Sequence, residues 1–167
     1  SSLTKIEGNL YIQSNTTLTD LSGLNNLTEI GGSLLIYSTS SLVSLHGLGS
    51  LASVGGYVRF EYNTALTSPE GLESLATIGN RLLVSHNDAF ASFEGLDSLT
   101  SIGTYISITY NDALESISAL HGLTSLGDYI LIGDNSALCN SAVDEFVTVM
   151  RAAGWDSTED TDRNAGC

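Results

Sequence analysis

The sequence predicts a mainly β protein: a parallel β-solenoid of stacked coils, covered at its C-terminal end by an α-helix. Two observations predict this fold. One template, L-T-S-I-G-G-x-L-x-I-x-x-N-x-A-L-x-S-L-x-G-L-x-S, recurs every 24 residues without a slip, and each copy contains a short period-two apolar pattern. The copies begin at Leu3, Leu27, Leu51, Leu75, Leu99 and Leu123.

Each copy predicts one short strand. The eighth and tenth template positions are apolar in every copy, as at Val58 and Phe60, and alternate with positions of mixed character. This alternation is typical of a strand with one buried and one exposed face. A strand of about five residues cannot bury a core alone, so successive copies must stack side by side in parallel. We therefore expect six coils over residues 1–138.

The remaining part of each coil carries apolar residues at every third position, as at Leu42, Leu45 and Leu48. This spacing favours short extended or 3₁₀ segments that turn corners. The thirteenth template position is asparagine in all copies but one, where Thr39 stands. We expect these amides to bond from coil to coil as a ladder, at a turn where left-handed backbone geometry is tolerated. They are Asn15, Asn63, Asn87, Asn111 and Asn135.

After Leu138 the template stops, and residues 139–167 predict a helical cap within the same domain. Ser141 is the expected N-cap and Gly154 the expected stop signal. The helix should cover the apolar cross-section of the last coil, with Trp155 packed against the same end. Its apolar stripe is Val143, Phe146, Val147 and Met150.

Two cysteines, Cys139 and Cys167, flank this tail. One disulfide in an oxidising compartment is the first interpretation, and two free thiols are the alternative. At the other end no comparable cap is visible at Ser1 and Ser2. Bare strand edges invite association, so a homodimer or an upstream domain is our hypothesis for the N-terminal end.

The charge balance excludes some partners. The chain has nineteen acidic residues and five lysines and arginines, which gives a net charge of −14. A surface of this charge repels phosphate groups. No apolar run approaches the roughly 20 residues of a membrane helix. We therefore expect no nucleic-acid partner and no membrane insertion.

All seven tyrosines fall on or beside the outward positions of the predicted strands. Tyrosine and arginine in a rigid array offer large contact area with polar tips, which suits protein or glycan surfaces. The alternative is that tyrosine merely forms strands well and stacks from coil to coil. The candidate ligand-binding residues are Tyr57, Arg59, Glu61, Tyr62, Arg81, His86, Tyr105, Tyr110 and Tyr129.

Three other uses of the same surface compete with binding. A polysaccharide-acting enzyme would need Arg59, Glu61, Arg81 and His86 to meet on neighbouring coils. A structural spacer would need no surface chemistry at all. Ice binding would need rows of small threonine-type residues, and these columns mix Tyr, Arg, His and Asp, which argues against it.

One acidic segment has a spacing similar to a calcium loop. Its order lacks the D-x-D-x-D-G run and the distal glutamate of an EF-hand, which favours a solvated charged segment and no cofactor. Two sequons, at Asn15 and Asn26, matter in a eukaryotic secretory route. The acidic residues weighed for Ca²⁺ are Asp156, Glu159, Asp160 and Asp162.

The unit IGGSLLIYSTSSLVSLHGLGSL, residues Ile30–Leu51, resembles the receptor L domain, and the match covers roughly residues 3–138. It is also similar to a leucine-rich repeat, although the leucine after the asparagine comes one position later. The resemblance implies a right-handed β-solenoid, a secreted or cell-surface location and a non-enzymatic binding or adhesive module. We therefore expect an extracellular protein or glycan as the partner.

Overall fold

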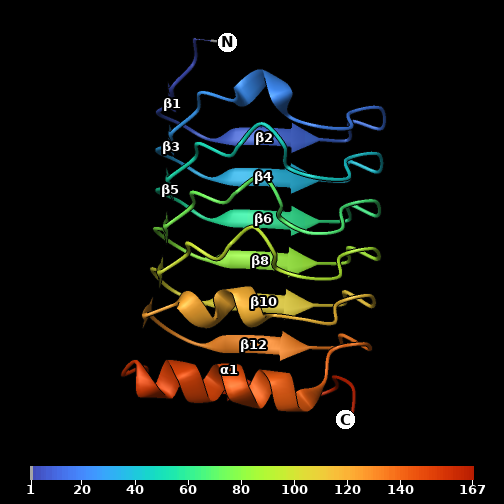
Figure 1. Cartoon of the computed structure of the whole chain (residues 1–167), viewed down its shortest axis with the longest axis vertical. Helices are drawn as coiled ribbons and strands as arrows, with labels where there is room; N and C mark the ends of the chain where they lie inside the picture. The colour runs from blue at the N-terminus through green and yellow to red at the C-terminus, as the bar shows by residue number, and fades with distance from the viewer. Residues whose placement is uncertain (1) are drawn as a thin grey trace.

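The protein is described here by a computed structural model of residues 2–167; Ser1, the first residue of the predicted repeat region, lies outside the described residues. The chain winds through stacked coils to a helix at the C-terminal end (Figure 1). Each coil contributes one four-residue strand to a parallel sheet, and five full 24-residue turns separate the first from the sixth, which confirms the β-solenoid. These strands are β2 (Leu10–Gln13), β4 (Leu34–Tyr37), β6 (Val58–Glu61), β8 (Leu82–Ser85), β10 (Ile106–Thr109) and β12 (Ile130–Gly133).

The core consists of apolar columns that run along the stack. In β6, Val58 and Phe60 are fully buried, whereas Arg59 and Glu61 between and beside them are half-buried and point outward. Val58 lies in register with Leu82 of the next coil, 24 residues on. Alternation within a strand and repetition between coils therefore place the same template position in the same column of the molecule.

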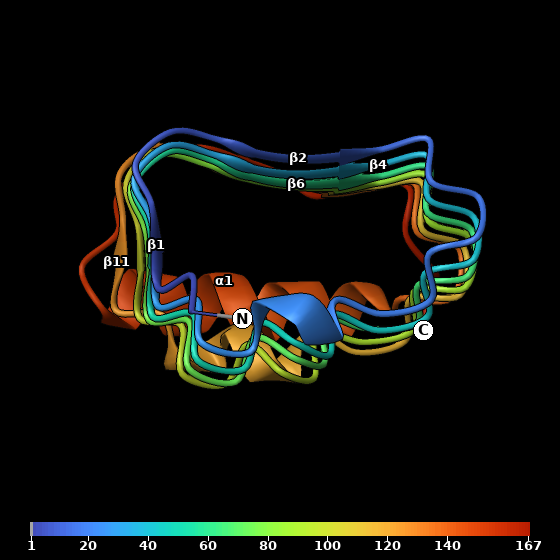
Figure 2. The ribbon, with the colours of Figure 1, turned by 90° about the horizontal axis from the view of Figure 1, so that it is seen from above.

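A second parallel sheet, made of two-residue strands, forms one short end of each coil. Seen along the stack (Figure 2), the long-strand sheet is one long side of the coil, and turns run along the opposite side. Gly31 permits the close approach of coils here, because a Cβ on it would lie 2.6 Å from the Glu7 carbonyl oxygen. The short strands are β1 (Lys5–Ile6), β3 (Glu29–Ile30), β5 (Ser53–Val54), β7 (Thr77–Ile78), β9 (Ser101–Ile102) and β11 (Ser125–Leu126).

The turning side has the three-residue periodicity that the sequence predicts. The Leu48 N–H donates to the Leu45 carbonyl at 3.1 Å, and the Leu51 N–H donates to the Leu48 carbonyl at 2.9 Å. These i to i−3 bonds are of the 3₁₀ kind and drop one leucine inward at each corner. Two coils carry full 3₁₀ segments, η1 (Ser22–Leu24) and η2 (Ser118–Gly122).

The asparagine ladder is confirmed from Thr39 to Asn135, whereas Asn15 donates to the Gln13 carbonyl of its own coil. Asn87 Oδ1 accepts the Asn63 N–H at 2.9 Å, and Asn87 Nδ2 donates to the Phe60 carbonyl of the preceding coil at 3.0 Å. The sequence predicts left-handed backbone geometry at the asparagine column itself. In the structure this geometry falls one position earlier, on the residue before each asparagine. Buried asparagines therefore join the coils, and the preceding residue makes the turn.

The helix α1 (Asn140–Ala152) lies across the end of the last coil and buries Val143, Phe146 and Met150. The predicted N-cap at Ser141 is wrong, because the cap position is Cys139 and Ser141 lies inside the helix. The disulfide and a bond from the Asn140 N–H to the Ala165 carbonyl, 2.9 Å long, hold the chain at Cys139, so the helix begins there.

The end of the helix agrees with the sequence. Gly154 has a φ of 95°, a left-handed value that ends the helix. Trp155 is buried at the same end, as expected, and its indole N–H donates to the Asp128 carbonyl. The Cys139–Cys167 disulfide is formed, so neither cysteine is free.

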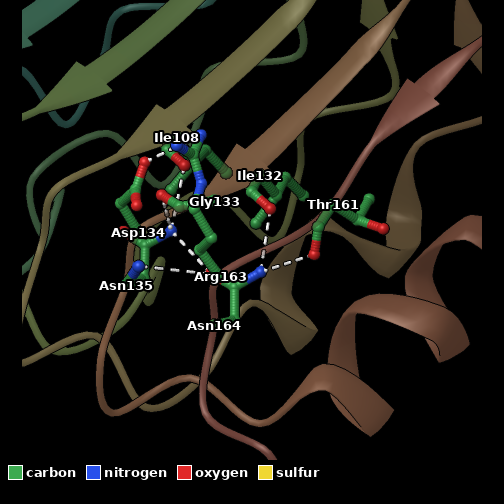
Figure 3. Close-up of polar contacts among 8 residues, drawn as sticks. All are labelled: Ile108, Ile132, Gly133, Asp134, Asn135, Thr161, Arg163 and Asn164. Atoms are coloured by element: carbon green, nitrogen blue, oxygen red, sulfur yellow. Dashed lines mark hydrogen bonds and ion pairs between the residues drawn. The ribbon is translucent and has the colours of Figure 1, made fainter.

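The last residues of the tail form a partial seventh lap. Strand β13 (Glu159–Asp160) adds to the long-strand sheet beside β12. Asn164 takes the next place in the ladder: its Oδ1 accepts the Asn135 N–H at 3.2 Å, and its Nδ2 donates to the Ile132 carbonyl at 2.8 Å (Figure 3). Arg163, with a left-handed φ of 67°, pairs with Asp134 at 3.1 Å.

At the other end of the stack, β1 and β2 are edge strands of their sheets. Leu3 and Tyr11 are exposed there, at 41% and 59%. The hypothesis that a partner associates at this end stays a prediction. Within residues 2–167, no helix is both long and apolar enough to cross a lipid bilayer.

Candidate ligand-binding face

The outer side of the long-strand sheet carries every tyrosine of the chain, and we call it the tyrosine face. It comprises each long strand with the residue before it and the residue after it. In each of β4, β6, β8 and β10, the two outward side chains are half-buried and the two inward ones are fully buried. The face consists of residues 9–14, 33–38, 57–62, 81–86, 105–110 and 129–134.

One aromatic column runs along the N-terminal ends of the strands. The guanidinium of Arg81 lies between two rings, 4.8 Å from the centroid of Tyr57 and 5.6 Å from that of Tyr105. Tyr105 in turn stacks on Tyr129 at 4.4 Å, with the planes 12° apart. Repetition of the coil thus puts a cation and three rings in one stack, which we call the Arg81 column.

Tyr129, at the end of the Arg81 column, is half-buried. Burial raises the pKa of its phenol, and a hydrogen bond with Tyr105 raises the pKa further. Both causes favour the neutral phenol, so the hydroxyl is held as a hydrogen-bonding group at the end of the column.

A second aromatic column follows the C-terminal ends of the strands, and we call it the His86 column. His86 stacks on Tyr62 at 4.7 Å and on Tyr110 at 4.8 Å, with the planes 25° and 26° apart. Tyr37 meets Tyr62 edge to face at 5.6 Å. Tyr62 and Tyr110 remain 43% and 48% exposed, so the column stands out from the sheet.

The backbone of the His86 column is left-handed. Tyr62, His86 and Tyr110 have φ values of 57°, 55° and 57°. This conformation favours glycine and asparagine and costs other residues roughly 1–2 kcal/mol each. Ser14 and Ser38 occupy the same position in the first two coils with the same geometry, so the turn itself does not require a large ring.

Near the N-terminal end, the tyrosine face has a hollow of about 330 Å³. Leu35 and Tyr37 are not among the ligand-binding residues that the sequence predicts. The signal for them was present, because both stand at outward strand positions, beside a column of tyrosines. The hollow is lined by Tyr11, Ile12, Gln13, Leu35, Tyr37 and Arg59.

The structure does not gather the four residues that an enzyme would need. Arg59 forms an ion pair with Glu61, which lies on the same strand. Arg81 and His86 belong to different columns, at opposite ends of β8. The four residues of β8 separate them, which makes five residue-to-residue steps and about 16 Å at about 3.3 Å each.

The acidic residues of the tail likewise do not gather into one cluster. Among residues 2–167, no three side chains of His, Cys, Asp or Glu converge where they could hold a metal ion. Glu159 instead pairs with Arg151 at 2.6 Å. Asp156, Glu159, Asp160 and Asp162 are thus not brought together by the fold.

Comparison with known protein families gives a match for this chain. Residues 4–76 match the model of the receptor L domain family, within the region where the sequence shows the resemblance. Neither the curated proteins nor the solved structures gave a match. The matched residues include the first three long strands, and the same register continues through β12. The first part of this chain thus matches the receptor L domain family, and the whole stack is a parallel β-solenoid, the fold that the resemblance implies.

Proposed function

We propose that this chain is an extracellular, non-catalytic binding module that holds a protein or glycan ligand on the tyrosine face. The observation that carries the proposal is the His86 column. Its three rings sit in a backbone conformation that disfavours them, where serine serves in other coils, and two of them are strongly exposed. Residues held in costly conformations without a structural need point to function.

The family match supports the coarse part of this proposal, because receptor L domains are ligand-binding modules of extracellular proteins. The disulfide supports an oxidising location, since such bonds persist outside the cytosol. Adhesion at a cell surface is the specific use that we propose for a secreted or surface-attached chain.

The competing uses find less support. A polysaccharide-acting enzyme needs clustered acids and bases, and Arg59 and Glu61 neutralise each other while Arg81 and His86 stand far apart. A spacer needs no large rings at left-handed positions. The tyrosine face is the feature that both alternatives leave unexplained.

The double variant Tyr62→Asn and Tyr110→Asn tests the proposal. Asparagine relieves the left-handed strain of roughly 1–2 kcal/mol per residue and loses ring stacking of about 0.5–1.5 kcal/mol per pair, so the melting temperature should hardly change. Capture of purified extracellular proteins and glycans from an array should be lost. Ser38→Asn, in the same column and geometry, is the matched control and should bind like the wild type.

Two results would contradict the proposal. Undiminished capture by a folded double variant would remove the His86 column from the site. Failure of the wild-type protein to bind any protein or glycan on such arrays would leave the spacer as the better reading.

A further inference from the structure

Arg81 differs from every other basic side chain in the chain. The remaining lysine and arginines each have a carboxylate within ion-pair distance, whereas Arg81 pairs with no carboxylate among residues 2–167. In a chain with nineteen acidic residues and five lysines and arginines, an arginine without an acidic partner needs an explanation. The pairs are Lys5 with Glu7 and Glu29, Arg59 with Glu61, Arg151 with Glu159, and Arg163 with Asp134.

The surroundings of Arg81 fix its position but leave its donors free. The rings of Tyr57 and Tyr105 hold the guanidinium from both sides, and its Nε–H is buried without a hydrogen-bond partner. At the other end of the same strand, His86 Nδ1 is also buried without a partner. A planar cation with fixed geometry and unused N–H groups is prepared for an oxygen anion, which it can bind through two parallel bonds.

Within the described chain, no carboxylate on the tyrosine face is left to pair with Arg81. Of the nineteen acidic residues, Glu61 and Asp134 alone lie on the tyrosine face, and both are already in ion pairs. The net charge of −14 is therefore carried by the rest of the surface. A ligand dense in negative charge would be repelled there, whereas one isolated anionic group could reach Arg81.

We propose that Arg81 pairs with a single carboxylate of a glycan whose other sugars are neutral. This inference rests on the proposed function and names the ligand class for the same face. The stacked rings turn their faces to one another, so the groups left for a ligand are phenol, imidazole and guanidinium edges, which match sugar hydroxyls. A protein ligand would favour an apolar anchor pocket, and the lining of the hollow beside Leu35 includes no residue of the Arg81 column.

An oligosaccharide array tests this assignment. It would carry neutral glycans, singly carboxylated glycans, the methyl esters of those same carboxylated glycans, and polysulfated chains. We expect wild-type binding to at least one singly carboxylated glycan and at least about tenfold weaker binding to its methyl ester, as expected for a lost charge-assisted contact. Polysulfated chains should not bind.

Variants of the intact chain connect this preference to Arg81. Arg81→Gln should reduce binding at least about tenfold, and Arg81→Lys, which keeps the charge without the fork, should fall between Arg81→Gln and the wild type. Lys5→Gln changes the net charge equally but lies off the tyrosine face, and it should bind like the wild type. Melting curves of all three variants verify that each is folded.

The outcomes separate this inference from the proposed function. Equal binding of carboxylate and methyl ester, binding by Arg81→Gln at wild-type strength, or strong binding of polysulfated chains would overturn the carboxylate assignment and leave the tyrosine face a binding site. Capture of proteins alone would overturn the glycan assignment. A wild-type protein that binds neither glycans nor proteins would overturn both.

Discussion

Asn111 shows how one residue can join three coils. Its Oδ1 accepts the N–H of Asn87 at 3.2 Å, its Nδ2 donates to the Val84 carbonyl at 3.0 Å, and its own N–H donates to Asn135 at 3.0 Å. All of these groups are buried, so water cannot replace a lost partner. The amide column therefore has a structural role, as its recurrence in the sequence predicts.

Asn111→Ala should lower the free energy of unfolding by about 3 kcal/mol, because it leaves buried N–H and carbonyl groups without partners. Asn15→Ala is the matched control in the same column. Asn15 is exposed and donates to the Gln13 carbonyl at 3.0 Å, so its loss should cost about 0.5 kcal/mol or less. Chemical denaturation of both variants measures the difference. Similar losses for the two would argue that the ladder does not stabilise the stack.

Strand β13 in the tail is an element that the sequence pattern does not predict. The period-three and period-two patterns are missing from Glu159–Asp160, because β13 is an edge strand with both residues exposed. Nothing in that stretch predicts a strand. The position of Asn164 is the one indication of a further lap. It follows Asn135 by 29 residues, five more than the 24-residue repeat, because the cap is inserted between them.

The disulfide should hold this partial lap in place. Cys139 and Cys167 are 28 residues apart, and closing a loop of that length contributes about 3.6 kcal/mol in the chain-entropy account. The double variant Cys139→Ser and Cys167→Ser should therefore melt at a lower temperature. In hydrogen exchange, amides of β12 and the tail should lose protection first, while β6 and β8 stay protected. Uniform loss of protection through the stack would show that the tail is not a separate unit.

For the whole molecule, each coil is stable because its neighbours cover it. Contacts run between adjacent strands in one unbroken register, from β2 to β12. The stability of the stack therefore depends on contacts between neighbouring coils. Removal of one whole coil should leave the remaining contacts intact.

Deletion of residues 27–50, one whole coil, should leave a folded protein that unfolds cooperatively at a somewhat lower temperature. It joins Asn26 to Leu51, two positions that already follow one another in the template. It removes Tyr37 but spares Tyr62, His86, Tyr110 and the Arg81 column. Deletion of residues 39–50, half a coil, should abolish folding, because strands would then face turns. Circular dichroism and thermal melting distinguish the two. A folded half-coil deletion would contradict the 24-residue lap.

The sequence by itself determined the length of the lap, the buried columns, the strands and the asparagine ladder. These follow from it because every coil repeats the same local pattern and the same contacts with its neighbour, so one readable unit specifies the rest. The left-handed backbone of the His86 column, the isolation of Arg81 between two rings and the seventh lap of the tail were decided by the tertiary structure. Each depends on which side chains the stacking brings into contact, and on a disulfide that returns a segment without any repeat to the edge of the sheet.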